Sequence, residues 1–389
     1  MTASIQIHGK CDSKFDSVKD VFLENFTKRG DVGAAVCVYV QGKPVIDLWG
    51  GYADAARSRP WERDTIVTVA STTKGMVATC AHLLVERGQL DLDLPVAHYW
   101  PEFAQKGKEN IPVRWLLSHR SGLPGVRQDM PPESLYDWDR YAAAIAEIEP
   151  WWEPGSKHGY HALTYGFLVG EVIRRVTGQS VGQFFKNEIS GPLNADFFIG
   201  VPENQDHRAA EVLPGPIPDI EESPILAKIL EDPEGMTARA FINPPRQPDV
   251  FNTRAWRAAE IPSSNGHTTA WAVARIYSML AQGGVLDGLR ILKSQTIENA
   301  IVEQSSGPDA ILVYPNRFAL GFGLSSELRP FGSNERAFGH SGQGGSTGFA
   351  DLDAQVSFGY VMNQFLSPTV EAPDLRWPAL ANAVFDCLN

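Results

Sequence analysis

Apolar residues recur at helical spacing along several segments of this chain. Val18, Val21, Phe22 and Phe26 lie three or four positions apart within residues 16–28, a spacing typical of an amphipathic helix. Similar patterns indicate further helices elsewhere in the chain. They are expected at residues 75–85, 113–117, 164–177, 268–282 and about 374–388.

Shorter runs rich in β-branched and aromatic residues predict strands. Residues 34–39 and 44–49 flank the turn Gln41-Gly42 and indicate a hairpin. Strands therefore lie toward both ends of the chain, with helices between them. This order predicts an α/β fold of the α+β type: an antiparallel sheet flanked by helices and formed from both chain ends, with an inserted mainly helical lobe. The C-terminal strands are expected at residues 318–324, 336–341, 346–351 and 356–363.

We expect the fold to divide into a discontinuous sheet domain, residues 1–70 and 265–389, and a mainly helical domain, residues 71–264. Within the helical domain, residues 201–262 contain ten prolines, with acidic residues between them and only short apolar runs. Such a composition predicts a long irregular insertion, because proline interrupts helices and sheets. The insertion either walls a substrate cleft or is a surface excursion without a role.

Composition narrows the class of protein. The chain has 389 residues, of which 43% are hydrophobic and 21% charged, as expected of a soluble globular protein with a large core. Its net charge of −12 argues against nucleic acid or an anionic membrane as a partner. The charge suits solubility and uncharged or cationic small substrates. Nothing in the sequence indicates the oligomeric state.

The cysteines and the N-terminal residues indicate the cellular compartment of the protein. Cys11, Cys37, Cys80 and Cys387 have no metal-ligand spacing. The N-terminus shows no basic segment followed by an apolar one, so no signal peptide is expected. No run approaches the ~18 apolar residues of a transmembrane helix. We therefore expect a protein with free thiols, without a membrane segment, in a reducing cytoplasm.

The segment Ser71-Thr72-Thr73-Lys74 carries the strongest candidate chemistry. It follows an apolar β-type run, residues 66–70, and opens the helical pattern at residue 75. A serine at a helix start and a lysine one turn later lie on the same face. The serine hydroxyl is a poor nucleophile until a neighbour takes its proton, and an amine in a dry cleft can do so because burial disfavours its charged form. Chance alone produces such a tetrad about once in a chain of this length.

Two further segments could complete a site. Residues 154–160 form a turn that presents the phenol of Tyr160, which can shuttle protons near an ammonium group; simple packing at a lobe edge is the alternative. The segment Gly339-His340-Ser341-Gly342-Gln343 ends a predicted strand among glycines. It could supply one amide of an oxyanion hole, with the amide of Ser71 as the other, or be an ordinary glycine-rich hairpin turn.

A competing motif is rejected. Residues 344–348 fit the Gly-x-Ser-x-Gly nucleophile elbow, with Ser346 as the nucleophile. That motif requires a strand–turn–helix and a downstream histidine, whereas a hairpin is predicted after Ser346 and no histidine follows His340. The histidines show no His-Glu-x-x-His pattern, and no nucleotide-binding fingerprint is present. No metal and no cofactor are therefore expected.

In this order, the Ser-x-x-Lys tetrad, the Gly-Tyr turn and the His-Ser-Gly strand end resemble those of one family. The chain resembles the serine β-lactamase and penicillin-binding-protein superfamily, and within it the class C β-lactamases and family VIII carboxylesterases. Residues 116–124 are also similar to a family segment. The resemblance covers residue 15 to the C-terminus and implies the β-lactamase-like form of the predicted fold.

The resemblance also implies roles for individual residues. Ser71 matches the acylated nucleophile, Lys74 its partner base and Tyr160 the family tyrosine, while the amides of Ser71 and Gln343 match the oxyanion hole. Which of Lys74 and Tyr160 is the resting base stays open. The family's Lys-Thr-Gly triad, which contacts substrate, is matched by His340, Ser341 and Gly342.

Two positions depart from the family pattern. Ala162 stands where an asparagine contacts the amide side chain of a β-lactam, and His340 stands where a lysine holds its carboxylate. Histidine is mostly neutral near pH 7, so both changes weaken the binding of an anionic β-lactam and leave acyl chemistry intact. If His340 orients the substrate or Tyr160, activity should fall as the pH drops from about 7 to about 6.

These observations favour a serine carboxylesterase that hydrolyses short-chain esters through an acyl-enzyme. Three alternatives stay open: a β-lactamase or D-alanyl peptidase, an acyltransferase, and a non-catalytic ligand sensor that is acylated without turnover. The natural ester is not indicated. Trp152 is a candidate substrate-binding residue, as are Trp151 and Phe251, although core packing explains these aromatic residues equally well.

Overall fold

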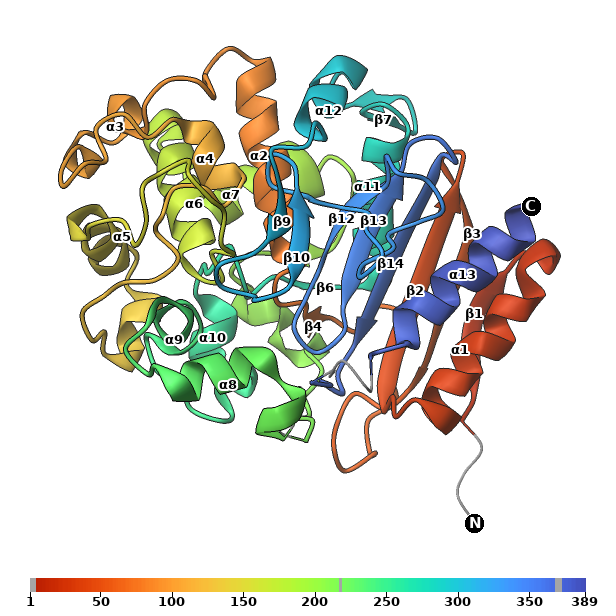
Figure 1. The fold of residues 1–389 in the computed structure, drawn as a ribbon. Coiled ribbons are helices and arrows are strands. Elements are labelled where there is room, and N and C mark those ends of the chain that lie inside the picture. Colours follow the sequence, from red (N-terminus) through yellow and green to blue (C-terminus); the bar gives the residue numbers. More distant parts are fainter. Residues whose placement is uncertain (1–4, 217–218, 368–372) are drawn as a thin grey trace.

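A nine-stranded antiparallel sheet forms the frame of the protein in the computed structural model, which describes residues 5–216, 219–367 and 373–389 (Figure 1). Its strand order is β1-β3-β2-β14-β13-β12-β11-β10-β9, and every neighbouring pair is antiparallel. The strands are β1 (Ile7–Cys11), β2 (Gly33–Val40), β3 (Lys43–Gly51), β9 (Ser305–Pro308), β10 (Pro315–Phe318), β11 (Gly323–Leu324), β12 (Phe338–Ser341), β13 (Thr347–Asp351) and β14 (Val356–Met362).

The two ends of the chain meet in the middle of this sheet. Strand β2 pairs with β14 over their whole lengths, with Val36 opposite Tyr360. Both strands read as nearly continuous apolar runs because both faces of the sheet are covered here. The predicted α/β fold, with an antiparallel sheet formed from both chain ends, is confirmed.

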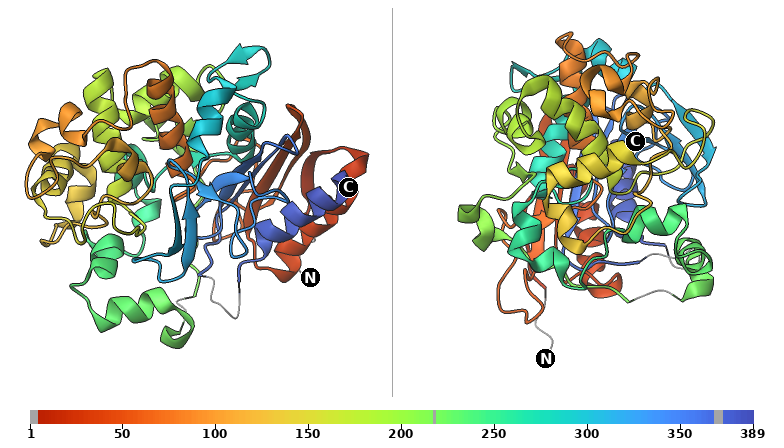
Figure 2. Two further views of the ribbon diagram at one scale, coloured as in Figure 1. Left: turned by 45° about the horizontal axis from the view of Figure 1, so that its top comes forward. Right: turned by 90° about the vertical axis from the view of Figure 1, so that its left-hand side faces the viewer.

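Helices cover the two faces of the sheet. Helices α1 (Asp16–Lys28) and α13 (Arg376–Leu388) pack against each other, and α11 (Ala270–Ala281) packs on β2, β13 and β14 (Figures 1 and 2). Successive strand residues point to opposite faces. A Cβ added at Gly348 would meet Val273 of α11, whereas the next side chain, Phe349, lies near Trp377 of α13. The sheet therefore lies between α11 and the α1–α13 pair.

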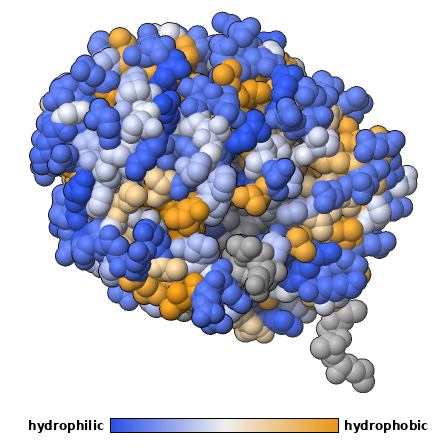
Figure 3. All heavy atoms as spheres, viewed as in Figure 1, coloured by the Kyte–Doolittle hydropathy of each residue, from blue (hydrophilic) through white to orange (hydrophobic). Residues whose placement is uncertain are grey.

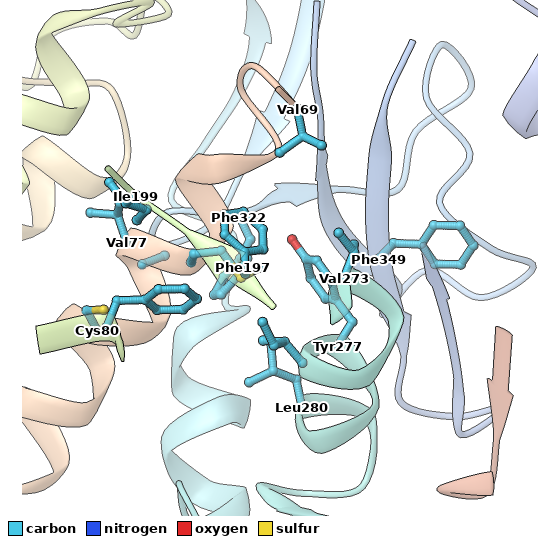
Figure 4. Packing of buried hydrophobic residues seen from close by; sticks show 14 of the residues in the cluster. Val69, Val77, Cys80, Phe197, Ile199, Val273, Tyr277, Leu280, Phe322 and Phe349 are labelled. Carbon is cyan, nitrogen blue, oxygen red and sulfur yellow. The ribbon is translucent and has the colours of Figure 1, made fainter. Parts of the chain in front are cut away.

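The remaining helices form a lobe beside the sheet (Figure 2). Helix α2 (Thr73–Glu86) is its central element, with twelve of its fourteen residues buried, and it packs against α6 (Thr164–Thr177). In Figure 4, Val77 and Cys80 of α2 lie on one side of the core and Tyr277 and Leu280 of α11 on the other, with Phe197 and Phe322 between them. The other helices outside residues 201–262 are α3 (Val96–Tyr99), α4 (Val113–Leu117), α5 (Trp138–Glu147), α7 (Val181–Phe185) and α12 (Ser294–Ala300).

Two small sheets complete the strand inventory of the described residues. In the three-stranded one, β6 (His267–Thr268) pairs on one side with β4 (Val67–Thr68) and on the other with β5 (Phe197–Phe198). A two-stranded hairpin consists of β7 (Val285–Leu286) and β8 (Leu289–Arg290). From the end of β4 the chain runs through residues 69 and 70 to residue 71.

The structure corrects two local expectations. Residues 318–324 are not one strand, because the chain reverses between β10 and β11, with the amide of Ala319 bonded to the carbonyl of Phe322. Residues 201–262 are not wholly irregular, because they contain α8 (Pro224–Glu231), α9 (Met236–Ile242) and α10 (Arg254–Ala258). No residue of α8 is buried. Figure 3 shows a mostly hydrophilic face with an apolar patch near its lower edge, where Figure 1 places α8.

Candidate active site

Ser71 lies at a tight turn between β4 and α2, and its side chain is half-buried. The preceding residue, Ala70, has a φ of 42°, a left-handed conformation that costs a non-glycine residue about 1 kcal/mol. The carbonyl of Ala70 accepts hydrogen bonds from the Thr73 amide (3.1 Å) and the Thr73 hydroxyl (2.6 Å). These bonds hold the strained turn and fix Ser71 just before the first turn of α2.

Lys74 is fully buried beside Ser71. Its Nζ atom lies 3.0 Å from Oγ of Ser71 and donates hydrogen bonds to the carbonyls of Ala162 (2.8 Å) and Ser263 (2.9 Å). Burial lowers the pKa of Lys74 well below its ordinary value. A neutral amine has two N–H groups and one lone pair. With both N–H groups on carbonyls, the lone pair is left for the Ser71 hydroxyl proton.

Tyr160 lies over the same amine. The centre of its ring is 4.8 Å from Nζ of Lys74, and the side chain is buried. Its backbone amide donates to Oδ1 of Asp309 (3.0 Å), which also accepts the amides of Ile311 and Leu312 (2.8 Å each). Burial raises the pKa of Tyr160, while a hydrogen bond to Ser71 lowers it less strongly. The phenol is therefore protonated at neutral pH.

His340 is the next-to-last residue of β12, and its ring centre lies 6.1 Å from that of Tyr160. Its Nδ1 lies 2.8 Å from the carbonyl of Ser341, so Nδ1 carries the proton and Nε2 is left as an acceptor. Within the described chain, the buried Nε2 atom has no partner. Burial lowers the pKa of His340 well below its ordinary value. A fall in activity that depends on His340 is therefore expected at lower pH than the range from about 7 to about 6.

The glycine-rich loop after β12 packs against the residues that precede Ser71. A Cβ at Gly342 would lie 2.2 Å from the carbonyl oxygen of Val69, so only glycine fits. Ser346 donates its hydroxyl to the same carbonyl (2.8 Å). Among the hydrogen bonds of the described residues, the amides of Ser71 and Gln343 are not donors. Both amides are thus free for an oxyanion.

Ser346 itself does not have the geometry of a nucleophile elbow. Its side chain is buried, and its hydroxyl is engaged by Val69 and lies 3.1 Å from Oγ1 of Thr72. The residue sits between β12 and β13, which form a hairpin rather than a strand–turn–helix. The sequence analysis rejected Ser346 as the nucleophile, and this arrangement agrees with that interpretation.

An apolar cluster adjoins Tyr160. Trp152, the sequence candidate for substrate binding, is buried in this cluster. Ala162 belongs to the same cluster while its carbonyl binds Lys74, so this position contributes a backbone group to the site. The cluster comprises Trp152, Tyr160, Ala162, Ala240, Ile311, Leu312 and Phe318. Of the other aromatic candidates, Trp151 packs against this cluster, whereas Phe251 packs against the main core.

Two buried histidines lie behind Tyr160. His161 bonds through Nδ1 to the carbonyl of Gly159 (2.6 Å), and its Nε2 accepts the amide of Leu123 (3.2 Å). Its backbone amide donates to Nδ1 of His119 (3.2 Å), whose ring lies 4.9 Å from that of Tyr160. Burial lowers the pKa of His161 to about 3, so it stays neutral. This network fixes the turn that carries Tyr160.

Sequence reasoning missed Asp309, Ser263 and Phe318, which hold or surround the site. Asp309 binds the amide of Tyr160 from 149 residues away, and Ser263 binds Lys74 from 189 residues away. No local pattern marks such residues, because their role depends on distant segments meeting in the fold. In the described part of the chain, no three His, Cys, Asp or Glu side chains gather as a metal site. Nor does any described helix combine the length and apolarity that a membrane crossing requires.

Comparison with known proteins agrees with this fold. A family model described as "Beta-lactamase" matches residues 21–383. The chain is 36% identical over 382 residues to "Esterase/beta-lactamase LipL" of Mycobacterium tuberculosis, a match that covers 95% of this chain and 85% of that protein. The solved structure of a family VIII carboxylesterase matches with a TM-score of 0.90 and 41% identity, covering 98% of this chain and 100% of that one.

A second solved structure, a penicillin-binding protein homologue from Caulobacter crescentus, matches with a TM-score of 0.87 and 37% identity, covering 98% of this chain and 100% of that one. Fold and relatives together define a hydrolase of the esterase and β-lactamase type. The chain belongs to the β-lactamase family. The resemblance to family VIII carboxylesterases and penicillin-binding proteins is confirmed.

Proposed function

We propose that the protein is a serine carboxylesterase that hydrolyses short-chain carboxylic esters through an acyl-enzyme on Ser71. One observation carries the proposal: Nζ of Lys74 lies 3.0 Å from Oγ of Ser71, and its other two hydrogen bonds go to carbonyl oxygens. A lysine held in this way is a base rather than an ion-pair partner. It can therefore accept the proton of Ser71 during attack.

In the acylation step, Oγ of Ser71 bonds to the ester carbonyl carbon while Lys74 takes its proton. Lys74 is the resting base in this scheme, because burial lowers its pKa and raises that of Tyr160. The amides of Ser71 and Gln343 stabilise the oxyanion; one such donor commonly contributes about 3 kcal/mol. The alcohol then leaves with a proton from Tyr160, which regains one from Lys74.

Hydrolysis of the acyl-enzyme completes the cycle. Water gives one proton to the Lys74–Tyr160 pair and its oxygen to the acyl carbon, and the bond from Ser71 to the acyl group breaks. Ser71 recovers its proton and the carboxylic acid is released. His340, Ser341 and Gly342 border the acyl group at the end of β12, and Trp152 borders it from the apolar cluster.

Two residues favour esters over β-lactams within this family. Ala162 has no amide side chain for a β-lactam, and His340 is neutral because burial lowers its pKa. The relative LipL carries both activities in its name, and another, EstB of Burkholderia gladioli, is an esterase. β-Lactam hydrolysis is therefore the second candidate function, to be tested with a chromogenic cephalosporin.

A paired serine variant tests the proposal. Ser71→Ala should abolish turnover of 4-nitrophenyl butyrate, whereas Ser346→Ala should retain most of it, because within the described part of the chain the Ser346 hydroxyl binds only Val69 and Thr72. Mass spectrometry of a peptide map after treatment with a fluorophosphonate should find the adduct on Ser71. An adduct on Ser346, or full activity in Ser71→Ala, would make this an elbow hydrolase instead.

The same assays separate the remaining alternatives. Steady multiple turnover of the ester excludes the ligand sensor, and product analysis with an added alcohol distinguishes hydrolysis from acyl transfer. We extend the proposal to a small-molecule ester as the partner, without nucleic acid or membrane, and to a cytoplasmic location. The four cysteines, none of which is in a disulfide, support a reducing compartment.

A further inference from the structure

Asp309 joins the turn that carries Tyr160 to the loop between β9 and β10. It directly follows β9, and its Oδ1 atom accepts the amide of Tyr160 (3.0 Å) and two amides of its own loop. The amide of Ala310 donates to the carbonyl of His158 (3.1 Å). A Cβ on Gly159 would lie 3.2 Å from that of Ala310, so the two segments are in direct contact. The loop and the turn are thus bonded to each other on both sides of Gly159.

The other carboxylate oxygen of Asp309 faces a histidine. Oδ2 of Asp309 lies 3.9 Å from Nε2 of His158, and the two side chains are 0% and 6% exposed. Neither atom has a hydrogen-bond partner within the described chain. A buried polar atom without a partner is costly, because it has lost its hydration. One hydrogen bond from Nε2 to Oδ2 would satisfy both atoms, and it requires an approach of only about 1 Å.

A neutral His158 can supply the proton for this bond. Burial lowers the pKa of His158, and the charge of Asp309 opposes this shift less strongly. The imidazole is therefore uncharged at neutral pH and has one N–H group, which Nε2 can carry. The ring centre of Phe318 lies 6.0 Å from that of His158 and 6.1 Å from that of Tyr160. Movement of the histidine is therefore coupled to Tyr160 through Phe318 as well as through the backbone.

We propose that Asp309 and His158 are positioning residues for Tyr160, which they hold where its phenol protonates the leaving alcohol. The proposal rests on the esterase function proposed above. Nε2–H of His158 donates to Oδ2 of Asp309, while Oδ1 keeps the amide of Tyr160. The proton that the alcohol takes comes from Tyr160 and is replaced from Lys74, whereas the proton of His158 stays within the pair. Position matters here because a displacement of about 1 Å at a reacting group can cost ~100-fold in rate.

Two butyrate esters with different leaving groups test the proposal. 4-Nitrophenol is a far stronger acid than ethanol, so 4-nitrophenyl butyrate can release its alcohol as an anion, whereas ethyl butyrate needs the proton of Tyr160. The leaving-group ratio is kcat/KM for 4-nitrophenyl butyrate divided by kcat/KM for ethyl butyrate, which is followed in a pH-stat. Asp309→Ala and His158→Leu should each raise this ratio about tenfold. A loss of folded protein alone lowers both rates equally and leaves the ratio unchanged.

Conservative variants separate hydrogen bonding from charge. Asp309→Asn keeps an oxygen for the amide of Tyr160 and turns an amide NH₂ group toward Nε2 of His158. His158→Gln keeps an NH₂ group within reach of Asp309. Both variants should therefore retain a ratio close to that of the wild type. A ratio in Asp309→Asn as high as in Asp309→Ala would show that Tyr160 requires the charge rather than the hydrogen bonds, and would overturn the proposal.

Two controls assign the effect to Tyr160. Tyr160→Phe should raise the ratio at least as much as His158→Leu does. The double variant Tyr160→Phe/His158→Leu should match Tyr160→Phe alone, because the histidine acts only through the phenol. His82 is a matched buried histidine on α2, whose Nε2 bonds to the carbonyl of Leu320 (2.8 Å). His82→Leu should lower the free energy of unfolding and leave the ratio unchanged.

The outcomes distinguish this proposal from the proposed function. If Ser71 is required for turnover but the ratio is unchanged in His158→Leu, or rises equally in His82→Leu, the pair does not position Tyr160 and the esterase proposal stands. Should Asp309→Ala not fold, His158→Leu carries the test, because it leaves the three amide bonds of Asp309 in place. If Ser71→Ala keeps full esterase activity, the proposed function fails first.

Discussion

In the proposed mechanism, the reactivity of Ser71 is set by the groups around it rather than by the serine itself. Lys74 is its nearest functional group, and burial makes that amine a base by lowering its pKa. The carbonyls of Ala162 and Ser263 orient the amine. Unlike a carboxylate, they carry no negative charge that would keep the amine protonated. A serine beside a solvated lysine would lack this activation, because the amine would remain protonated near neutral pH.

Replacing the lysine at position 74 by a residue that cannot act as a base should remove most of the esterase activity. Lys74→Arg keeps the positive charge but cannot give up its proton at usable pH, so kcat/KM for 4-nitrophenyl butyrate should fall by ~10³ or more. In the wild type, activity requires the neutral amine and is lost as the pH falls through the pKa of Lys74. That rising limb should lie well below the ordinary lysine value of about 10.4, as measured from pH–rate profiles. Substantial activity in Lys74→Arg would exclude the amine as the base.

Helix α2 positions the site because it fits closely against α11. Gly75, the residue after Lys74, allows this approach: a Cβ there would lie 2.3 Å from the hydroxyl oxygen of Tyr277. Figure 4 shows Tyr277 extending from α11 toward α2. The Tyr277 hydroxyl has no partner among the described residues.

This contact gives an element-scale prediction. Gly75→Ala should lower the free energy of unfolding by about 2 kcal/mol, because the added methyl group overpacks the interface. Tyr277→Phe removes the clashing oxygen, so the double variant Gly75→Ala/Tyr277→Phe should recover most of that loss. Urea denaturation of the two single variants and the double variant measures the coupling. Simple additivity of the two changes would show that Gly75 and Tyr277 do not clash.

At the scale of the molecule, a buried ion-pair network joins both chain ends to the loop that carries Gln343. Arg376 of α13 donates to Asp31 (2.9 Å), to Asp374 (2.6 Å) and to the carbonyl of Gly344. Asp31 also accepts the hydroxyl of Tyr360 on β14. Arg376 and Asp31 are both buried. One guanidinium group thereby connects the N-terminal region, the C-terminal helix and the loop beside Ser71.

Breaking this network should be costly for stability. Arg376→Met leaves the carboxylate of Asp31 buried without its cation, so the free energy of unfolding should fall by about 4 kcal/mol. The double variant Asp31→Asn/Arg376→Met removes both charges and should lose less than Arg376→Met alone. Chemical denaturation of the two variants tests this order. A double variant less stable than Arg376→Met would show that the lone carboxylate is not the cause.

Much of the fold could be predicted because its signals are local. The alternating and helical patterns of residues 16–51 gave α1, β2 and β3 within a few residues, since side-chain periodicity reflects which face is buried. Residues 318–324 were misassigned because a short apolar run does not reveal a chain reversal. Residues 201–262 were expected to be irregular because prolines obscured their short helices, although Pro224 merely starts α8.

The sequence by itself determined the chemistry that lies within one helical turn. Ser71 and Lys74 share a helix face, and this follows from the helical period alone. Only the tertiary structure decided which distant groups surround them. Asp309, Ser263 and Arg376 carry no local pattern, and each acts through a segment far away in the chain. The physical reason is that burial and electrostatic environment are properties of the packed molecule, whereas periodicity is a property of the chain.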